Sequence, residues 1–173
     1  MKSARDIAGI ALTVALLICG QLLLSAVPGV EVVTLIFVAY SFVFGRIRGM
    51  VVATIFSLVR QFIFGLWPTV LILYLVYYNF LALVMGTLGV VLKNKREIVK
   101  IVWVTIVAVV STVMFTMIDN VITPLFYGYS LQTAIAYFYS SLTFMIPQII
   151  CVGISVGILF MPLSKVFLIL KSK

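Results

Sequence analysis

The chain has 173 residues, of which 65% are hydrophobic and 9% are charged. No soluble domain can cover so much apolar surface with so few polar side chains, so we expect a single all-α integral membrane domain over residues 1–173. The chain contains no His and no G-x-x-x-x-G-K-[ST] loop, which removes the commonest catalytic base and the usual ATP-binding motif. We therefore expect no enzyme activity, no metal site and no bound cofactor.

Apolar stretches long enough to cross a bilayer follow one another along the chain, and their ends carry Gly, Pro or charged residues. After the fifth stretch, residues 124–130 are expected to form a loop. The remaining stretch, residues 131–170, is too long for one simple span, so we expect its start, to about residue 139, to lie in the membrane interface. The six predicted spans are residues 7–27, 30–44, 50–66, 69–92, 98–122 and 141–167.

The basic residues predict the topology. Eleven of the twelve Lys and Arg residues fall in four groups, located before the first span, after the second, after the fourth and at the end of the chain. Six spans place all four groups on one face, which the positive-inside rule identifies as cytoplasmic, with both termini on that side of the membrane. This distribution explains the net charge of +8 better than a nucleic-acid partner does.

Three charged residues lie towards the opposite face. Arg60 is five residues before Gly65 and Asp119 is five residues before Pro124, which puts both roughly 7–8 Å inside the outer ends of their predicted helices. Glu31 begins the second span. Ionisable groups at such depth are candidates for function, although Arg60 and Asp119 could form a structural ion pair and Glu31 could only stabilise a helix start.

Aromatic and polar side chains gather on the same outer side. Tyr and Trp are common at membrane interfaces in any case, but few of them lie at the basic side, and one-sided aromatics with convergent polar groups are typical of a ligand cavity. We expect four aromatic residues to stack on a ring system, namely Trp67, Tyr74, Tyr78 and Tyr127. We expect five further residues to contact the polar groups of the ligand, namely Glu31, Arg60, Asp119, Asn120 and Gln148.

These features together resemble the substrate-binding S components of energy-coupling factor (ECF) transporters. The likeness covers most of the chain and includes its size, its six spans and an Ala-rich first span. Its most specific part comprises two segments, Val30-Glu31-Val32-Val33-Thr34-Leu35 and Val43-Phe44-Gly45-Arg46. The first is similar to a Glu-Leu-Val-Thr/Ser segment and the second to a Phe-Gly-Lys/Arg segment of S components that often have no assigned substrate.

The resemblance implies a particular function. An S component captures a vitamin or related micronutrient from outside, using the first outer loop and the outer parts of spans four to six. An Ala-xxx-Ala face, here Ala11 and Ala15, would dock on a transmembrane coupling subunit driven by two cytoplasmic ATPases. Many similar proteins carry Asp, His and Asn on the sixth span, where this chain has Gln148, Cys151 and Ser155. The identity of the substrate therefore does not transfer.

Two alternatives stay open from the sequence. The chain could be a non-transport scaffold or assembly factor of the cell envelope, which predicts a packed outer side and no small-molecule ligand. It could also be a solitary facilitator that works without ATP. Co-purification with a coupling subunit and two ATPases would separate the S component from both.

Overall fold

The computed structural model describes residues 4–25 and 32–172, and over these residues it is helical, with no strand. This confirms the predicted all-α class. The six helices are α1 (Ala4–Leu24), α2 (Val33–Phe44), α3 (Arg46–Phe64), α4 (Pro68–Val91), α5 (Glu97–Tyr127) and α6 (Leu131–Ser172).

Five of these helices are long and apolar enough to cross a membrane. The exception is α2, whose 12 residues extend about 18 Å, less than the roughly 30 Å of a hydrocarbon core. Nearly every side chain of α2 is nevertheless buried, including Phe37, Val38 and Ala39. A helix that is apolar all round belongs inside a protein, and α2 packs against all five other helices at the centre of the bundle.

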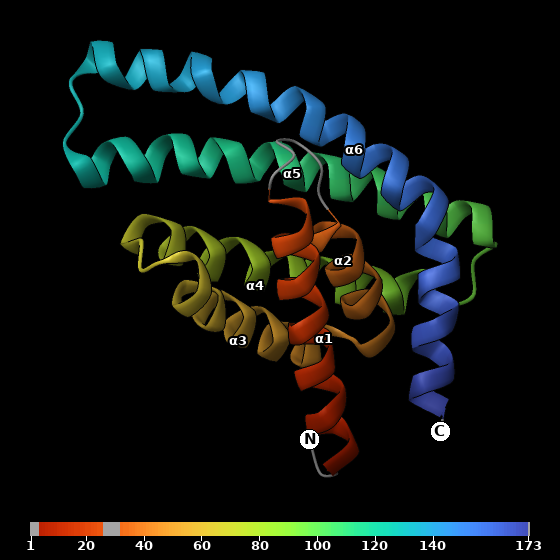
Figure 1. Cartoon of the computed structure of the whole chain (residues 1–173). Helices are drawn as coiled ribbons and strands as arrows, with labels where there is room; N and C mark the ends of the chain where they lie inside the picture. Colours follow the sequence, from red (N-terminus) through yellow and green to blue (C-terminus); the bar gives the residue numbers. More distant parts are fainter. Residues whose placement is uncertain (1–3, 26–31, 173) are drawn as a thin grey trace.

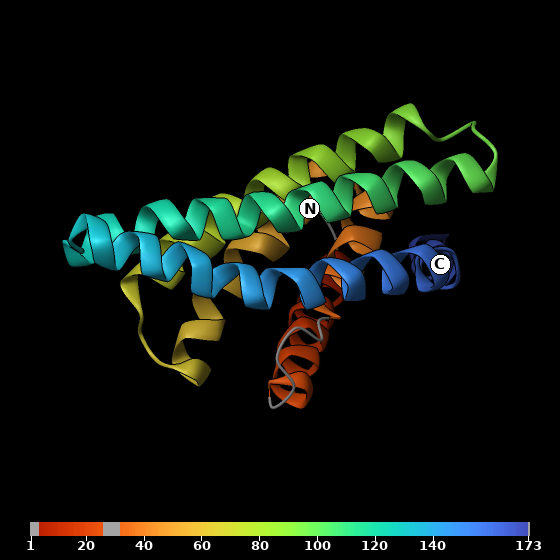
Figure 2. The same cartoon turned by 90° about the horizontal axis from the view of Figure 1, so that it is seen from above.

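The helices are arranged around α2 in two groups (Figure 1). Helices α3 and α4 form one antiparallel pair, and α5 and α6 form a second, longer hairpin whose tip projects beyond the first pair in both views (Figure 2). Helix α1 crosses over α2 and α3 and does not contact α6. Close packing of α4 on the α2–α3 corner depends on Gly86 and Gly89, where an added Cβ would collide with the backbone of Arg46 and Phe42 respectively.

The expected loop over residues 124–130 is wrong. Helix α5 continues through Pro124 to Tyr127, where Gly128 adopts a left-handed conformation and donates its N–H to the Pro124 carbonyl. Pro removes one backbone donor but does not end a helix that neighbouring helices support, as membrane helices often show. Asp119 is consequently eight residues, or about 12 Å, from the end of its helix.

The expected division of the last stretch at residues 139–141 is also not seen. Helix α6 is continuous over 42 residues and includes both Pro147 and Pro162. At 1.5 Å per residue it is about 63 Å long, far more than one perpendicular span requires. Figure 1 shows that it follows α5 over its first part and then turns away toward the C-terminus.

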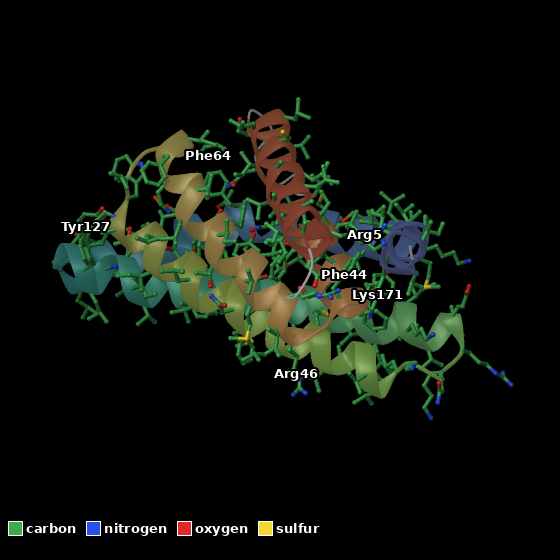
Figure 3. The ribbon with its side chains drawn as sticks, turned by 90° about the horizontal axis from the view of Figure 1, so that it is seen from below. Arg5, Phe44, Arg46, Phe64, Tyr127 and Lys171 are labelled. Atoms are coloured by element: carbon green, nitrogen blue, oxygen red, sulfur yellow. The ribbon has the colours of Figure 1, made fainter. Side chains whose placement is uncertain are left out.

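The basic residues of four different segments meet at one end of the bundle, which we call the basic end. The start of α1 pairs with the start of α3 through Asp6 and Arg48, at 2.8 Å. The end of α6 meets the end of α2 where Lys171 Nζ donates to the Val43 carbonyl at 2.6 Å. Phe64 and Tyr127 lie at the opposite end (Figure 3).

Candidate ligand cavity

A cavity of about 210 Å³ lies between α1, α4, α5 and α6, and we call it the tyrosine cavity. Its main wall is α4, where Tyr74, Tyr77 and Tyr78 fall on one face because residues three and four apart share a side of a helix. Helix α5 adds Thr112 and Phe115. Neutral hydrogen-bonding groups complete the lining, namely Gln21 and Ser25 from the α1 end and Gln148 from α6.

The aromatic wall is held by edge-to-face contacts. The Phe115 ring meets the Tyr77 ring at 4.9 Å and 69° and the Tyr74 ring at 5.8 Å and 77°. Behind them, Tyr78 is 2% exposed and packs against Phe37 and Phe56. Such pairs stabilise by about 0.5–1.5 kcal/mol beyond the area they bury, so the wall is preformed rather than assembled around a ligand.

Arg60 supports this wall from behind and does not line the cavity. Its guanidinium carbon lies 4.4 Å from the Tyr74 ring centroid and 4.9 Å from the Phe64 centroid. Its Nε donates to Gln21 Oε1 at 3.2 Å, and Gln21 Nε2 donates to the Tyr74 hydroxyl at 3.1 Å. Arg60 therefore fixes two side chains that do face the cavity, which are Gln21 and Tyr74.

A second cavity of about 270 Å³ lies next to the first between α5 and α6, and we call it the aspartate cavity. The two share Phe115, Phe144 and Gln148 in their linings. The α5 residues that line the two cavities, from Thr112 to Asp119, recur at helical spacing and so lie on one face of the helix. Among the described residues, Asp119 is the charged side chain that lines either cavity, and neither is lined by Lys or Arg.

Asp119 is oriented by two neutral donors. The Tyr137 hydroxyl donates to Asp119 Oδ2 at 2.6 Å, and the Thr123 hydroxyl donates to Oδ1 at 2.8 Å. Beside it, Asn120 Nδ2 donates to Ser141 Oγ at 2.8 Å, while Asn120 Oδ1 is buried with no hydrogen-bond partner in the described part of the chain. Asn120 itself lines neither cavity, so among the described residues the aspartate cavity presents the Asp119 carboxylate and no positive charge.

The possible ion pair between Arg60 and Asp119 is not present. The described ion pairs are Asp6 with Arg48 and Glu97 with Lys165. Arg60 contacts side chains of α1, α3 and α4, whereas Asp119 is bound by side chains of α5 and α6. The two charges are therefore held separately, with Arg60 behind the wall of the tyrosine cavity and Asp119 in the lining of the aspartate cavity.

Other expected site residues fall elsewhere. Trp67 is 57% exposed before α4 and Tyr127 is 46% exposed at the end of α5, and neither lines a cavity. Glu31 lies outside the described residues. Ala11 and Ala15, the expected docking residues, are exposed on the outer face of α1.

Sequence reasoning missed several residues of the cavities. Gln21 is a lone polar group in an apolar helix, and its role depends on Arg60 and Tyr74, which are distant in sequence. Tyr137 was placed in the expected interfacial segment and Ser141 at the start of the sixth predicted span, so the two were not read as one helical face. Read as one helix, the residues 137, 141, 144 and 148 have spacings of four, three and four, which is the signal of a single helical face.

Comparison of the chain with family models, with curated proteins and with solved structures finds no match.

Proposed function

We propose that this protein is the membrane-embedded S component of an ECF-type importer and that it captures a small vitamin-like molecule in the joined tyrosine and aspartate cavities. The observation that carries the proposal is this pair of adjacent cavities, of about 210 and 270 Å³, because a ligand that occupied both would fill a volume within the range of about 300–1,000 Å³ of small-molecule sites. Their aromatic wall with a few fixed polar groups is typical of such sites, whereas a packed interior would favour a scaffold.

The linings favour one kind of ligand. The tyrosine wall suits a flat ring, since aromatic rings bind one another by offset or edge contacts. Asp119 suits a hydrogen-bond donor or a positive charge at the other end of the molecule. Arg60 is directed to Gln21 and Tyr74, so it positions the wall and does not grip an anionic ligand. The proposed ligand is an aromatic compound that bears an amine, an amidine-like group or a ring cation.

The remaining parts of the proposal concern topology and partners. With the basic end in the cytoplasm, both termini lie inside and the α3–α4 and α5–α6 turns lie outside. The exposed small residues of α1, including Ala11 and Ala15, would let a helix of the coupling subunit approach closely. Two cytoplasmic ATPases bound to that subunit would supply the energy, since the chain has no ATP-binding motif of its own.

The test is mass spectrometry of the small molecule that co-purifies with the full chain. Asp119→Asn should abolish retention of a cationic compound, because the charge-assisted bond is lost while the shape of the side chain is kept. Asn94→Asp, which changes one charge in the opposite direction in the basic loop, serves as the control and should retain it. No small molecule in any preparation would contradict ligand capture, and a retained ligand without co-purifying ATPases would favour the solitary facilitator.

A further inference from the structure

A third cavity lies at the basic end, away from the proposed ligand site. It is a groove of about 620 Å³ between α1 and the C-terminal part of α6, and we call it the basic groove. It exists because α1 and α6 each pack on α2 but not on each other. Figure 1 shows the two helices on either side of α2. The volume is roughly twenty times that of one water molecule, so the groove is too large for a single bound ion.

The walls of the groove are apolar. Leu12 and Leu16 of α1 face Val166 and Leu170 of α6, and Ile36 of α2 forms part of the floor. The four wall residues are each about half exposed, with values of 45–56%. In a bilayer, apolar surface of this kind is covered by acyl chains, which are as apolar as Leu itself.

The end of the groove is cationic. Arg5, Arg48 and Lys171 line it together with one acid, Asp6, which pairs with Arg48 at 2.8 Å. Arg48 and Lys171 converge on one ring, with their charged groups 5.6 and 5.9 Å from the Phe44 centroid. Figure 3 shows Arg5, Phe44 and Lys171 close together, at the opposite end from Phe64 and Tyr127. Three cations and one acid leave an excess of positive charge beside the apolar walls of the groove.

We propose that the basic groove binds one phospholipid with an anionic headgroup, with the phosphate at Arg5 and Lys171 and an acyl chain along the walls of α1 and α6. Both halves of the site are needed for this assignment. The cations select the charge of the headgroup, as basic pockets between membrane helices do at a cytoplasmic face. A free phosphate would occupy only the cationic end and leave the apolar walls without a ligand contact, so it does not account for the whole groove. The site is separate from the tyrosine and aspartate cavities and does not depend on the proposed transport function.

The test is native mass spectrometry of the full chain in mild detergent, titrated with phosphatidylglycerol or with phosphatidylcholine of the same acyl chains. The wild type should bind phosphatidylglycerol at least tenfold more tightly. Arg5→Gln and Lys171→Gln should each weaken its binding about fivefold, and the double variant about 25-fold. Arg48 is kept, because its loss would leave Asp6 unpaired.

Two further variants separate charge from shape. Lys165→Gln makes the same charge change on α6, but Lys165 pairs with Glu97 outside the groove, so this variant should bind lipid like the wild type. Leu16→Trp fills the groove without changing charge and should weaken the binding of both lipids. Thermal unfolding followed by circular dichroism checks that each variant is folded.

Several results would overturn the assignment. Equal binding of the two lipids, or equal losses in Lys165→Gln and Lys171→Gln, would show that the excess charge does not select the headgroup. Competition by inorganic phosphate, with Leu16→Trp unaffected, would indicate a simple anion site. A dimer that Leu16→Trp disrupts, with lipid binding unchanged, would assign the groove to a second copy of the chain.

Discussion

The separation of Arg60 from Asp119 predicts which side chains are energetically coupled. In the structure, Arg60 contacts the Tyr74 ring at 4.4 Å, and Gln21 links the two side chains by hydrogen bonds at 3.2 and 3.1 Å. Replacing Arg60 by Met and Tyr74 by Leu, singly and together, gives a double-mutant cycle for this contact. A second cycle combines Arg60→Met with Asp119→Asn, the pair that the sequence alone would favour.

The magnitudes follow from the contacts of Arg60. Its ring contacts stabilise by about 0.5–2 kcal/mol and its charged hydrogen bond by about 1.5–3 kcal/mol. Against this, its Nη1 is buried with no hydrogen-bond partner among the described residues, which costs about 1–3 kcal/mol. Arg60→Met should therefore lower the free energy of unfolding by only roughly 1–2 kcal/mol, and the variant should stay folded.

The two coupling energies show whether Arg60 interacts with Tyr74 or with Asp119. We expect about 0.5–2 kcal/mol between Arg60 and Tyr74, and less than about 0.5 kcal/mol between Arg60 and Asp119, because Asp119 is bound by Tyr137 and Thr123 instead. The assay is equilibrium unfolding in mixed micelles, followed by circular dichroism. A larger coupling in the Asp119 cycle than in the Tyr74 cycle would refute the separation and restore the ion pair.

Three other predictions concern the fold, the cavity and the docking face. Gly89→Ala should destabilise the protein by about 3 kcal/mol or more in thermal unfolding, because the added Cβ would meet the Phe42 backbone. Gly153→Ala is the control and should be neutral or stabilising, since the nearest neighbour atom lies 3.7 Å from its Cβ. Equal effects of the two substitutions would contradict the close approach of α4 to the α2–α3 corner. Tyr74→Ala should reduce retention of the co-purifying ligand at least tenfold, whereas Trp67→Ala should leave it unchanged, since Tyr74 alone of the two lines a cavity. A larger loss of retention in Trp67→Ala than in Tyr74→Ala would move the site to the exposed turn. Ala11→Trp should block uptake of the ligand into cells but keep ligand binding, because it adds bulk only on the exposed face of α1. Normal uptake of the ligand would exclude that face as the docking surface.

Composition was sufficient to predict the helical class, because a chain so poor in charge can satisfy its backbone in a membrane only by helices or a closed barrel. Helix ends were less predictable. Pro124 was read as a helix end, although its missing N–H removes only one backbone bond and α6 packs alongside. The length of α2 was overestimated for a related reason, since hydrophobicity alone does not distinguish a membrane span from a helix buried at the centre of the bundle.

The site was predictable where aromatic or polar residues lie within a predicted span. Tyr74 and Tyr78 line the tyrosine cavity, Asp119 lines the aspartate cavity and Gln148 lines both, as expected for a ligand site on this side. Trp67 and Tyr127 are aromatic and near the same end, but they sit at helix ends, where side chains face outward. Contacts between helices are invisible to residue spacing along one helix, which is why the bridge from Arg60 through Gln21 to Tyr74 was not foreseen.

Arg60 and Asp119 each link a different group of helices, and this determines how a bound ligand would act on the fold. Arg60 ties together α1, α3 and α4, and Asp119 ties together α5 and α6. The tyrosine cavity lies between these two groups, where the Phe115 ring meets the rings of Tyr74 and Tyr77, and the aspartate cavity adjoins it between α5 and α6. A molecule with its ring on the α4 tyrosines and its donor on Asp119 would therefore link the two groups of helices and stabilise their arrangement by its own binding free energy. In the proposed S component, this would report ligand occupancy to the coupling subunit, because α1 contributes Gln21 to the tyrosine cavity and also carries the proposed docking face.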